Sequence, residues 1–144
     1  MKLELNTERL LLTPYASTDL DIALELWTDP EVVEYVCDVV TEAEIRQEMP
    51  DAEIEIGFFF KPTAWGRGYA TEVCKRLLRF AFKEVSLDEV VASVDEENVA
   101  SKKVLEKSGL INRGRTRSYG KYSPIYRITR DEWNESIMGS DFYE

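Results

Sequence analysis

A turn carrying two glycines connects an apolar segment to a helical pattern, and this stretch has the clearest chemical signature in the sequence. Residues 52–61 alternate as a strand, Gly66-Arg67-Gly68 forms the turn, and residues 69–85 follow with helical periodicity. The first N–H groups of a helix lack intrahelical partners and point outward at the positive end of its macrodipole. Glycine lets the backbone approach a ligand closely. The stretch therefore predicts an anion site that suits a phosphate.

Two common phosphate motifs do not fit this turn. The lysine P-loop fails because no Gly-Lys-Ser/Thr follows a glycine at the right distance. The dinucleotide pattern G-x-G-x-x-G fails because Thr71 stands where the third glycine should be. The turn therefore has the sequence Gly-Arg-Gly-Tyr-Ala and matches neither of these two motifs.

Length and composition limit the classes of protein to consider. With 144 residues and 44% hydrophobic content, residues 1–144 are expected to form one domain with a single core. There is no stretch of about 18 uncharged apolar residues that could span a membrane. Met1 to Asn6 lacks the apolar segment of a signal peptide. We therefore expect a cytoplasmic protein with no membrane partner.

Charge and residue types restrict the chemistry. The net charge of -10 argues against a nucleic-acid partner and suits a positively charged one, although acidic balance also serves solubility. Histidine is absent, which removes the commonest general base and zinc ligand, so no metal is expected. Cys37 and Cys74 are far apart and are expected to be reduced thiols.

The first part of the chain predicts a strand followed by helices. Residues 7–15 form an apolar run closed by a proline, which predicts a strand. Ser17 or Thr18 is positioned to cap a helix that ends near Asp29-Pro30. Short helices are expected over residues 31–36 and from Thr41.

The second part predicts alternating strands and helices. The strand before the glycine turn and the helix after it each have an apolar face, formed respectively by Ile54, Ile56, Phe58 and Phe60 and by Ala70, Val73, Leu77, Phe80 and Ala81. Residues 90–94 predict a buried strand parallel to the one before the turn, because a helix connects the two. Asn98 is expected to cap a helix through Lys107 that Gly109 ends.

The C-terminal part predicts a hairpin and a closing helix. Arg113, Arg115 and Arg117 alternate along one strand and residues 125–129 pair back to it. A carboxylate or phosphate of an acceptor could bind this arginine face, but pairing with the protein's own acids is favoured. Residues 131–136, with Trp133, are expected to close the fold.

Three motifs in order resemble the GNAT N-acetyltransferase superfamily. They are the turn Trp65-Gly66-Arg67-Gly68-Tyr69-Ala70-Thr71-Glu72, then Asn98-Val99-Ala100-Ser101, then Leu105-Glu106-Lys107-Ser108-Gly109-Leu110. The resemblance spans residues 6–133 and is strongest to the branch of ribosomal-protein N-terminal acetyltransferases. Trp65 departs from the family's general pattern, which has Gln or Arg there. The resemblance implies an α/β fold with a mixed, twisted central sheet, helices on both faces, and strands that splay at the acetyl-CoA site.

One expected element is missing from the sequence. The resemblance implies a hairpin of two strands before the glycine-turn strand, yet Met49-Pro50-Asp51 runs directly into Ala52. Either the hairpin is shortened or the chain is not continuous between Met49 and Ala52. We favour the second interpretation, because a sheet without two central strands would leave the core of the family fold open.

The resemblance implies a set of cofactor-binding residues for acetyl-CoA as co-substrate. These are Phe59, Phe60, Arg67, Gly68, Tyr69, Ala70, Thr71, Asn98 and Ser101. The backbone amides of Phe59 and Phe60 would polarise the thioester carbonyl. Lys102 and Lys103 could reach the phosphates, although a solvated helix face is the favoured interpretation for both.

Attack by an amine requires loss of a proton from the ammonium form, so a base or a water bound to one is needed. Glu55 matches the branch's glutamate and is our candidate. The alternatives are that Glu55 is only a solvated carboxylate, or that catalysis uses positioning alone.

The superfamily's acid is often a tyrosine seven residues after the asparagine, where this chain has Leu105. Ser101 is therefore the second catalytic candidate, as a contact to the sulfur. Tyr119, Tyr122 and Tyr126 are alternatives for which packing or surface roles are favoured.

The sequence thus predicts an N-acetyltransferase that moves an acetyl group from acetyl-CoA directly to a primary amine. By resemblance the acceptor is a protein N-terminal amine. A small-molecule amine, such as a polyamine or an aminoglycoside, is the alternative in the same class. A non-catalytic acyl-CoA-binding module is the alternative in another. We expect a monomer or a homodimer.

Overall fold

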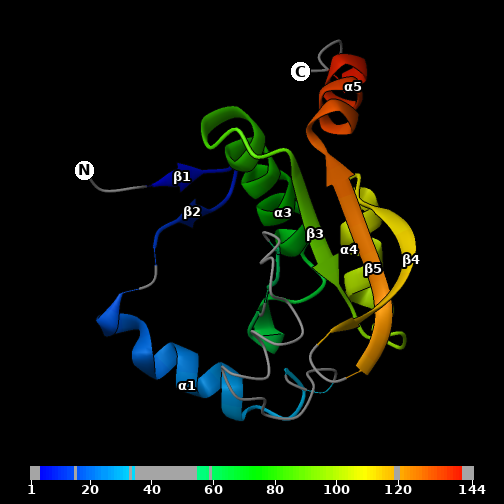
Figure 1. Ribbon diagram of the computed structural model, residues 1–144. Helices are drawn as coiled ribbons and strands as arrows, with labels where there is room; N and C mark the ends of the chain where they lie inside the picture. The colour runs from blue at the N-terminus through cyan, green and yellow to red at the C-terminus, as the bar shows by residue number, and fades with distance from the viewer. Residues whose placement is uncertain are drawn as a thin grey trace.

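An antiparallel sheet of three strands forms the centre of the structure (Figure 1). In it, β3 (Glu89–Ser93) pairs with β5 (Lys121–Thr129), which pairs with β4 (Ile111–Ser118). A second, separate sheet contains β1 (Leu5–Asn6) and β2 (Leu11–Leu12). The computed structural model describes residues 4–14, 16–32, 34, 55–58, 60–118 and 121–140.

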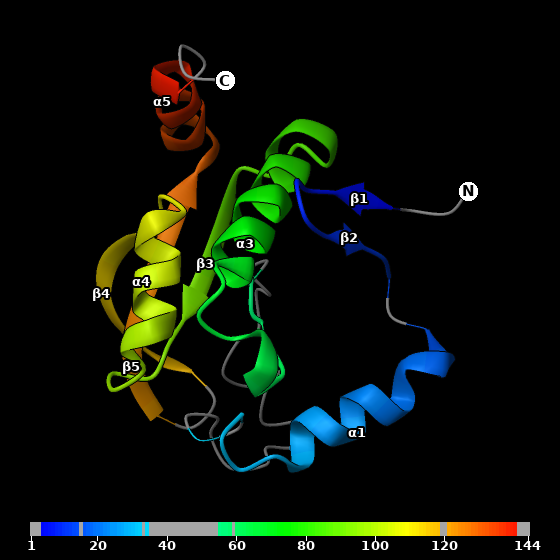
Figure 2. The same cartoon turned by 180° about the vertical axis from the view of Figure 1, so that it is seen from behind.

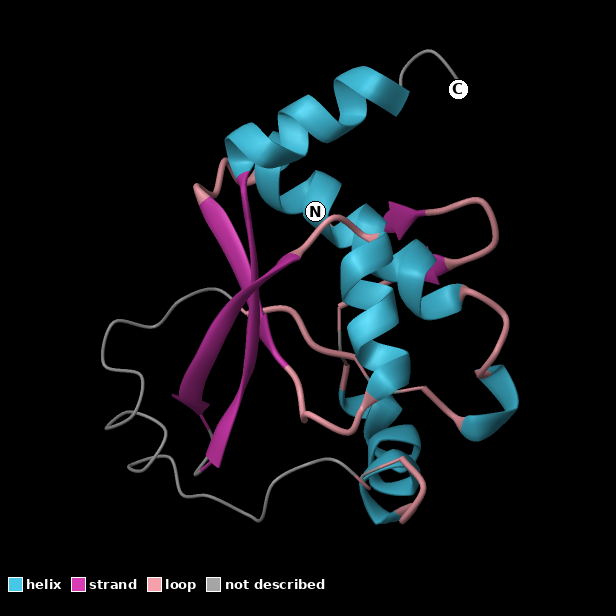
Figure 3. Cartoon of the chain, turned by 90° about the vertical axis from the view of Figure 1, so that its right-hand side faces the viewer, coloured by secondary structure: helices cyan, strands magenta, loops and turns pink. Residues whose placement is uncertain are grey.

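Helices α3 and α4 pack on the same face of the three-stranded sheet (Figures 2 and 3). The α-helices are α1 (Leu20–Thr28), α3 (Tyr69–Arg79), α4 (Val99–Lys107) and α5 (Arg130–Ser140). Short 3-10 turns, η1 (Ser17–Asp19) and η2 (Pro62–Ala64), precede α1 and α3, and a π-helical turn, η3 (Phe80–Glu84), follows α3. The mixed α/β class is confirmed. Helices were expected on both faces of the sheet, and the described residues show helices α3 and α4 on one face.

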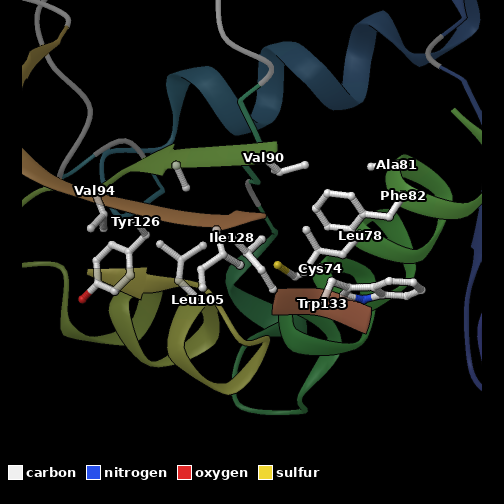
Figure 4. Close-up of a cluster of buried hydrophobic side chains, with 12 residues drawn as sticks. Cys74, Leu78, Ala81, Phe82, Val90, Val94, Leu105, Tyr126, Ile128 and Trp133 are labelled. Atoms are coloured by element: carbon white, nitrogen blue, oxygen red, sulfur yellow. The ribbon is translucent and has the colours of Figure 1, made fainter. Parts of the chain in front are cut away.

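The core lies between the sheet and these two helices (Figure 4). Cys74 and Leu78 reach it from α3, Leu105 from α4, and Ile128 from β5, and all four are buried. Trp133 of α5 closes one end of the core, as expected, with its ring 5.6 Å from that of Phe82. Ile56 and Phe58 pack against the same cluster, which confirms the predicted inner face of their segment at these two positions.

The buried face of α3 is rotated from the predicted one. Ala81 of the predicted face is buried as expected, but Val73 and Leu77 are only partly buried, and Cys74 and Leu78 are fully buried instead. The helix is also not continuous through Val85: it changes to a π-helical turn at Phe80. There the Val85 N–H donates to the Phe80 carbonyl at 3.0 Å. Both apolar sets have helical spacing, so periodicity did not distinguish them.

The predicted first strand, residues 7–15, is instead a turn between β1 and β2 followed by the short β2. The Thr7 N–H donates to the Leu10 carbonyl at 2.9 Å, and the Leu10 N–H donates to the Thr7 hydroxyl at 2.9 Å. The threonine side chain thus satisfies a backbone group that a strand partner would otherwise satisfy, which stabilises the turn.

Helix α1 begins later than the predicted caps. Its N-cap is Asp19, whose Oδ2 accepts the Ala16 N–H at 2.8 Å, so neither Ser17 nor Thr18 caps it. Its C-cap is Asp29, next to Pro30, as predicted. Residues 31, 32 and 34 lie in turn structure, while the rest of the expected short helix, the segment from Thr41, and the junction between Met49 and Ala52 lie outside the described residues.

The hairpin of β4 and β5 is confirmed and carries a bulge. The register shifts between Asn112 and Arg115, and Gly114 within the bulge has φ 108°. The bulge interrupts the two-residue alternation that would have put Arg113 and Arg115 on one face. Arg113 pairs with Glu132 of α5 at 2.6 Å, and Arg115 pairs with Glu96 after β3.

Candidate active site

Among its described residues, the glycine-turn segment joins the main sheet at a parallel bridge between Glu55 and Val91. The Ile56 N–H donates to the Val91 carbonyl at 2.9 Å. This pairing confirms the parallel crossover expected between this segment and β3. In a regular parallel ladder the next donor on β3, the Ser93 N–H, would bond to the Ile56 carbonyl.

Ser93 instead bonds to the side chain of Glu55. Glu55 Oε1 accepts the Ser93 hydroxyl at 3.1 Å and the Ser93 N–H at 3.4 Å. The carboxylate therefore occupies the place of a backbone carbonyl at the point where the two segments part. The splay that the resemblance implied starts here, and the candidate base Glu55 is fixed at it. The sequence did not indicate Ser93, because nothing in a β-branched strand marks one serine as a partner for a distant carboxylate.

The loop after this segment is closed by Trp65. Its Nε1–H donates to the Phe60 carbonyl at 2.8 Å, around the η2 turn that Pro62 begins. Lys61 pairs with Glu25 at 3.2 Å and connects the loop to α1. Trp65 thus has a structural role at the position where the family pattern has Gln or Arg. Phe60 is half-buried, and Phe59, the other residue expected to polarise a carbonyl, lies outside the described residues.

The turn into α3 has the backbone conformation predicted for an anion site. Gly66 has φ 72° and Gly68 has φ 79°, a region that residues with a Cβ rarely adopt. The first α3 bond runs from the Glu72 N–H to the Gly68 carbonyl at 3.1 Å. Helix geometry leaves the N–H groups of residues 69–71 without an intrahelical acceptor, at the positive end of the dipole. Paired phosphates fit this turn, because no side chain grows from either glycine and Arg67 is exposed beside it.

A polar cluster that the sequence analysis missed holds the start of α3. Glu72 accepts the Thr7 hydroxyl and the Arg9 N–H at Oε2, the latter at 3.0 Å, and the Arg9 Nε–H at Oε1 at 2.8 Å. The Thr7 hydrogen bond, and then those from Arg9, lower the pKa of Glu72. An acidic residue in a first helical turn is a common signal, but its partners here are 63 and 65 residues away in sequence.

Helix α4 begins as predicted. Asn98 is its N-cap, and Asn98 Oδ1 accepts the Ser101 N–H at 3.1 Å. The cap uses the side-chain oxygen, so the Asn98 amide nitrogen is the group that could donate to a pantetheine arm. Ser101 is half-buried in the first turn of α4. The two candidates therefore lie on the same helical turn, close to the end of β3 that bonds to Glu55.

The tyrosine position of the family lies in the core of this protein. Leu105 is 2% exposed and packs in the core cluster. Of the alternative acids, Tyr126 is also buried, its hydroxyl donates to Glu106 at 3.1 Å, and burial followed by Glu106 raises its pKa. Tyr122 is exposed, and Tyr119 lies outside the described residues. For Tyr126 the favoured interpretation, packing, agrees with its burial.

The described residues also show the surroundings of the two α4 lysines and of Cys74. Lys102 pairs with Glu96 at 3.2 Å, and Lys103 is exposed on the same helix. Cys74 is a free, buried thiol, and Cys37 lies outside the described residues. Within the described residues there is no group of three or more side chains suited to hold a metal ion. Among those same residues, no helix has the length and apolar character needed to cross a membrane.

Comparisons with known proteins identify related acetyltransferases. Residues 45–111 match the family model described as an acetyltransferase (GNAT) domain. The chain is 33% identical over 89 residues to the uncharacterized N-acetyltransferase YnaD of Bacillus subtilis, covering 56% of this chain and 51% of that protein. It is 32% identical over 85 residues to the putative ribosomal N-acetyltransferase YdaF of Bacillus subtilis, covering 55% and 46%. The chain thus spans about half the length of each of these two relatives.

A longer alignment joins the chain to the uncharacterized N-acetyltransferase p20 of Bacillus licheniformis. The two are 26% identical over 155 residues, covering 81% of this chain and 87% of p20. The alignment is longer than the 144 residues of this chain, so p20 has residues within the aligned region that this chain lacks. The break in the chain that we expect between Met49 and Ala52 stays a prediction.

Solved structures share the fold. The GNAT-family acetyltransferase of Bacillus anthracis superposes with a TM-score of 0.72 at 24% identity, covering 90% of this chain and 99% of that one. AAC(6')-Ib in complex with parmomycin and acetyl-CoA superposes with a TM-score of 0.68 at 13% identity, covering 85% and 94%. At these identities the similarity establishes the architecture.

Proposed function

We propose that this chain, part of which matches the GNAT acetyltransferase domain, transfers an acetyl group from acetyl-CoA directly to a primary amine. The observation that carries the proposal is that one matched segment, residues 45–111, contains the glycine turn, the Glu55 carboxylate and the Asn98 cap. The structure brings Glu55 and β3 together at the start of the splay, at 3.1 Å between Glu55 Oε1 and the Ser93 hydroxyl.

The co-substrate supplies a thioester, whose carbonyl carbon accepts the amine and whose thiolate leaves. In our proposal the N–H groups of Tyr69, Ala70 and Thr71 bind its paired phosphates, and Arg67 and Gly68 shape that cradle. The Asn98 amide holds the pantetheine arm, and the backbone N–H groups of Phe59 and Phe60 polarise the carbonyl. No covalent intermediate on the protein is proposed.

Glu55 is proposed to take the proton from the ammonium form of the acceptor. Its carboxylate is half-buried at the point where strand pairing ends, which is where a substrate could reach the interior without breaking a ladder bond. The Ser93 donors hold Oε1 in a defined position, as a base requires for proton transfer. Ser101 is proposed to contact the departing sulfur, because Leu105 provides no hydroxyl.

We propose a protein N-terminal amine as the acceptor. The support is the resemblance to the branch of ribosomal-protein N-terminal acetyltransferases and the similarity to YdaF, a putative ribosomal N-acetyltransferase. The net charge of -10 favours a cationic acceptor of either size. A small-molecule amine is the alternative that the experiment below must separate.

The test is thiol release from acetyl-CoA with a panel of peptides with free N-termini, polyamines and aminoglycosides. Release with peptides alone supports the proposal, and release with small amines alone overturns the acceptor. Background release with every amine, together with coenzyme A binding in calorimetry, would identify a non-catalytic binding module instead.

A substitution of Glu55 tests its proposed role as the general base. E55Q is expected to lower kcat by about 10²-fold to 10⁴-fold, because the base is removed while the side-chain shape is kept. Coenzyme A affinity should not change. E89Q is the matched control, since Glu89 is a half-buried carboxylate at the other end of β3. An E55Q rate equal to that of the wild type would mean that positioning alone supplies the catalysis.

A further inference from the structure

One guanidinium group contacts two residues of the first turn of α3 and lies close to the last residue of the glycine turn. Arg9 Nε lies 2.8 Å from Glu72 Oε1, and the Arg9 guanidinium carbon lies 4.6 Å from the centre of the Tyr69 ring. A Cβ built on Gly68 would lie 3.4 Å from Arg9 Nη2. Arg9 therefore contacts the first turn of α3, close to Gly68, where the backbone N–H groups of α3 become available.

Arg9 is itself held by its neighbours in the chain. The turn of residues 7–10 is closed by the Thr7 hydroxyl, which accepts the Leu10 N–H at 2.9 Å. The same hydroxyl donates to Glu72 Oε2, which also accepts the Arg9 N–H at 3.0 Å. Glu72 thus accepts both backbone and side-chain donors, so the segment docks on α3 in one orientation.

We propose that Arg9 and Glu72 are positioning residues for coenzyme A: together they fix the orientation of Gly68 and Tyr69, and with it the direction of the phosphate-binding N–H groups. This inference rests on the proposed function, because it assigns the residues to that same site. Neither residue needs to touch the ligand. The effect is geometric, since a phosphate held by backbone donors loses affinity when those donors rotate.

The chemistry of arginine makes the inference testable. A guanidinium donates through Nε and stacks on an aromatic ring at the same time, whereas an ammonium provides a point charge without that planar geometry. If Arg9 served only as a positive charge near the phosphates, lysine would replace it. If Arg9 positions the turn, lysine behaves as a loss of function.

The chain offers a matched control on the same helix. Arg76, near the end of α3, donates from Nε to the Asn6 carbonyl at 3.0 Å. Arg76 therefore fastens the same N-terminal segment to the same helix, two turns away from the phosphate-binding N–H groups. A general loosening of that segment would follow from R76K as well as from R9K.

The experiment measures coenzyme A affinity by calorimetry, and the KM for acetyl-CoA and for the acceptor, in R9K, E72Q and R76K. We expect R9K and E72Q each to weaken coenzyme A binding by up to about fivefold, since each change weakens exposed contacts of modest strength. The KM for the acceptor and the affinity of R76K should stay at wild-type values. Thermal unfolding of each variant shows that it is folded.

Two outcomes overturn the inference. Wild-type affinity in both R9K and E72Q would show that the cluster does not position the turn, and equal weakening in R76K would show that only docking of the segment matters. If the wild-type protein bound no coenzyme A, that result would instead contradict the proposed function, and the inference that rests on it would fail too. The wild-type titration therefore separates the two failures.

Discussion

The two halves of α3 are held by different kinds of interaction. At its amino end, exposed polar groups fasten the first turn, with Arg9 and Glu72 at 2.8 Å as the central pair. In its second half, Cys74 and Leu78 are buried at 0% and 1% exposure against the sheet. The first turn is thus held by directional hydrogen bonds and an ion pair, and the second half is held by the packing of buried side chains.

The difference shows how the glycine turn can be held in a defined conformation without being part of the core. Exposed ion pairs contribute little to stability, typically up to about 1 kcal/mol, while buried apolar side chains contribute several times more. Changes at the amino end should therefore affect ligand affinity more than folding. Changes in the second half should affect folding first.

The largest effect is expected from L78A. Removing a fully buried leucine side chain should lower the free energy of unfolding by about 2–5 kcal/mol, because transfer energy is lost and a cavity remains. Urea denaturation measures this change. L77A is the control, since Leu77 is only partly buried, and its loss should be clearly smaller. A larger loss for L77A would restore the face that periodicity had predicted.

G68A should weaken coenzyme A binding more than it destabilises the fold. A residue with a Cβ at φ 79° carries a strain of about 1–2 kcal/mol, so affinity should fall by about tenfold as the turn relaxes. Calorimetry with coenzyme A measures the affinity. G114A imposes a similar strain in the β4 bulge, at φ 108°, and should leave the affinity unchanged.

Alkaline pH should weaken the second half of α3 through Cys74. Burial raises the pKa of the Cys74 thiol, so the folded protein keeps a proton that the unfolded chain loses. Its stabilising contribution is complete below the unfolded pKa of about 8.5 and decreases, by up to about 1.4 kcal/mol per pH unit, as the pH rises towards the folded pKa. Unfolding measured from pH 7 to 10 should show this slope in the wild type, and C74S should lack it.

Acid should weaken the amino end through Glu72, with the smallest effect. The pKa of Glu72 is lowered in the folded state, first by Thr7 and then by Arg9. Its contribution is therefore complete above the unfolded pKa of about 4.3 and is lost as the pH falls through the lowered folded value. The difference in stability between wild type and E72Q, measured from pH 7 to 2.5, should shrink over that interval. A difference that stayed constant would mean that the carboxylate charge does not hold the turn.

Several features of the site were correctly predicted because their partners are close in sequence. Asn98 caps α4 through a bond to Ser101, and Gly109, with φ 98°, follows its end. The positive φ angles of Gly66 and Gly68 agree with the turn that their spacing indicated. In each case the stabilising interaction or the backbone requirement lies within a few residues, so the local pattern contains it.

The errors have an equally physical origin. The strand predicted over residues 7–15 became a turn because the Thr7 hydroxyl bonds to the Leu10 backbone and to Glu72, which belongs to another element. The inner face of α3 was placed one residue early because two apolar sets satisfied the same period. Packing in the core cluster, not periodicity, selected Leu78.

The sequence by itself determined the mixed α/β class, the glycine turn before α3 and the Asn98 cap of α4, because short-range hydrogen bonds and backbone conformation depend on neighbouring residues. Only the tertiary structure decided that Ser93 holds Glu55 and that Arg9 holds the start of α3. Those pairs are separated by 38 and 63 residues. Contacts over such separations exist only after the sheet and α3 have docked, so no local pattern specifies them.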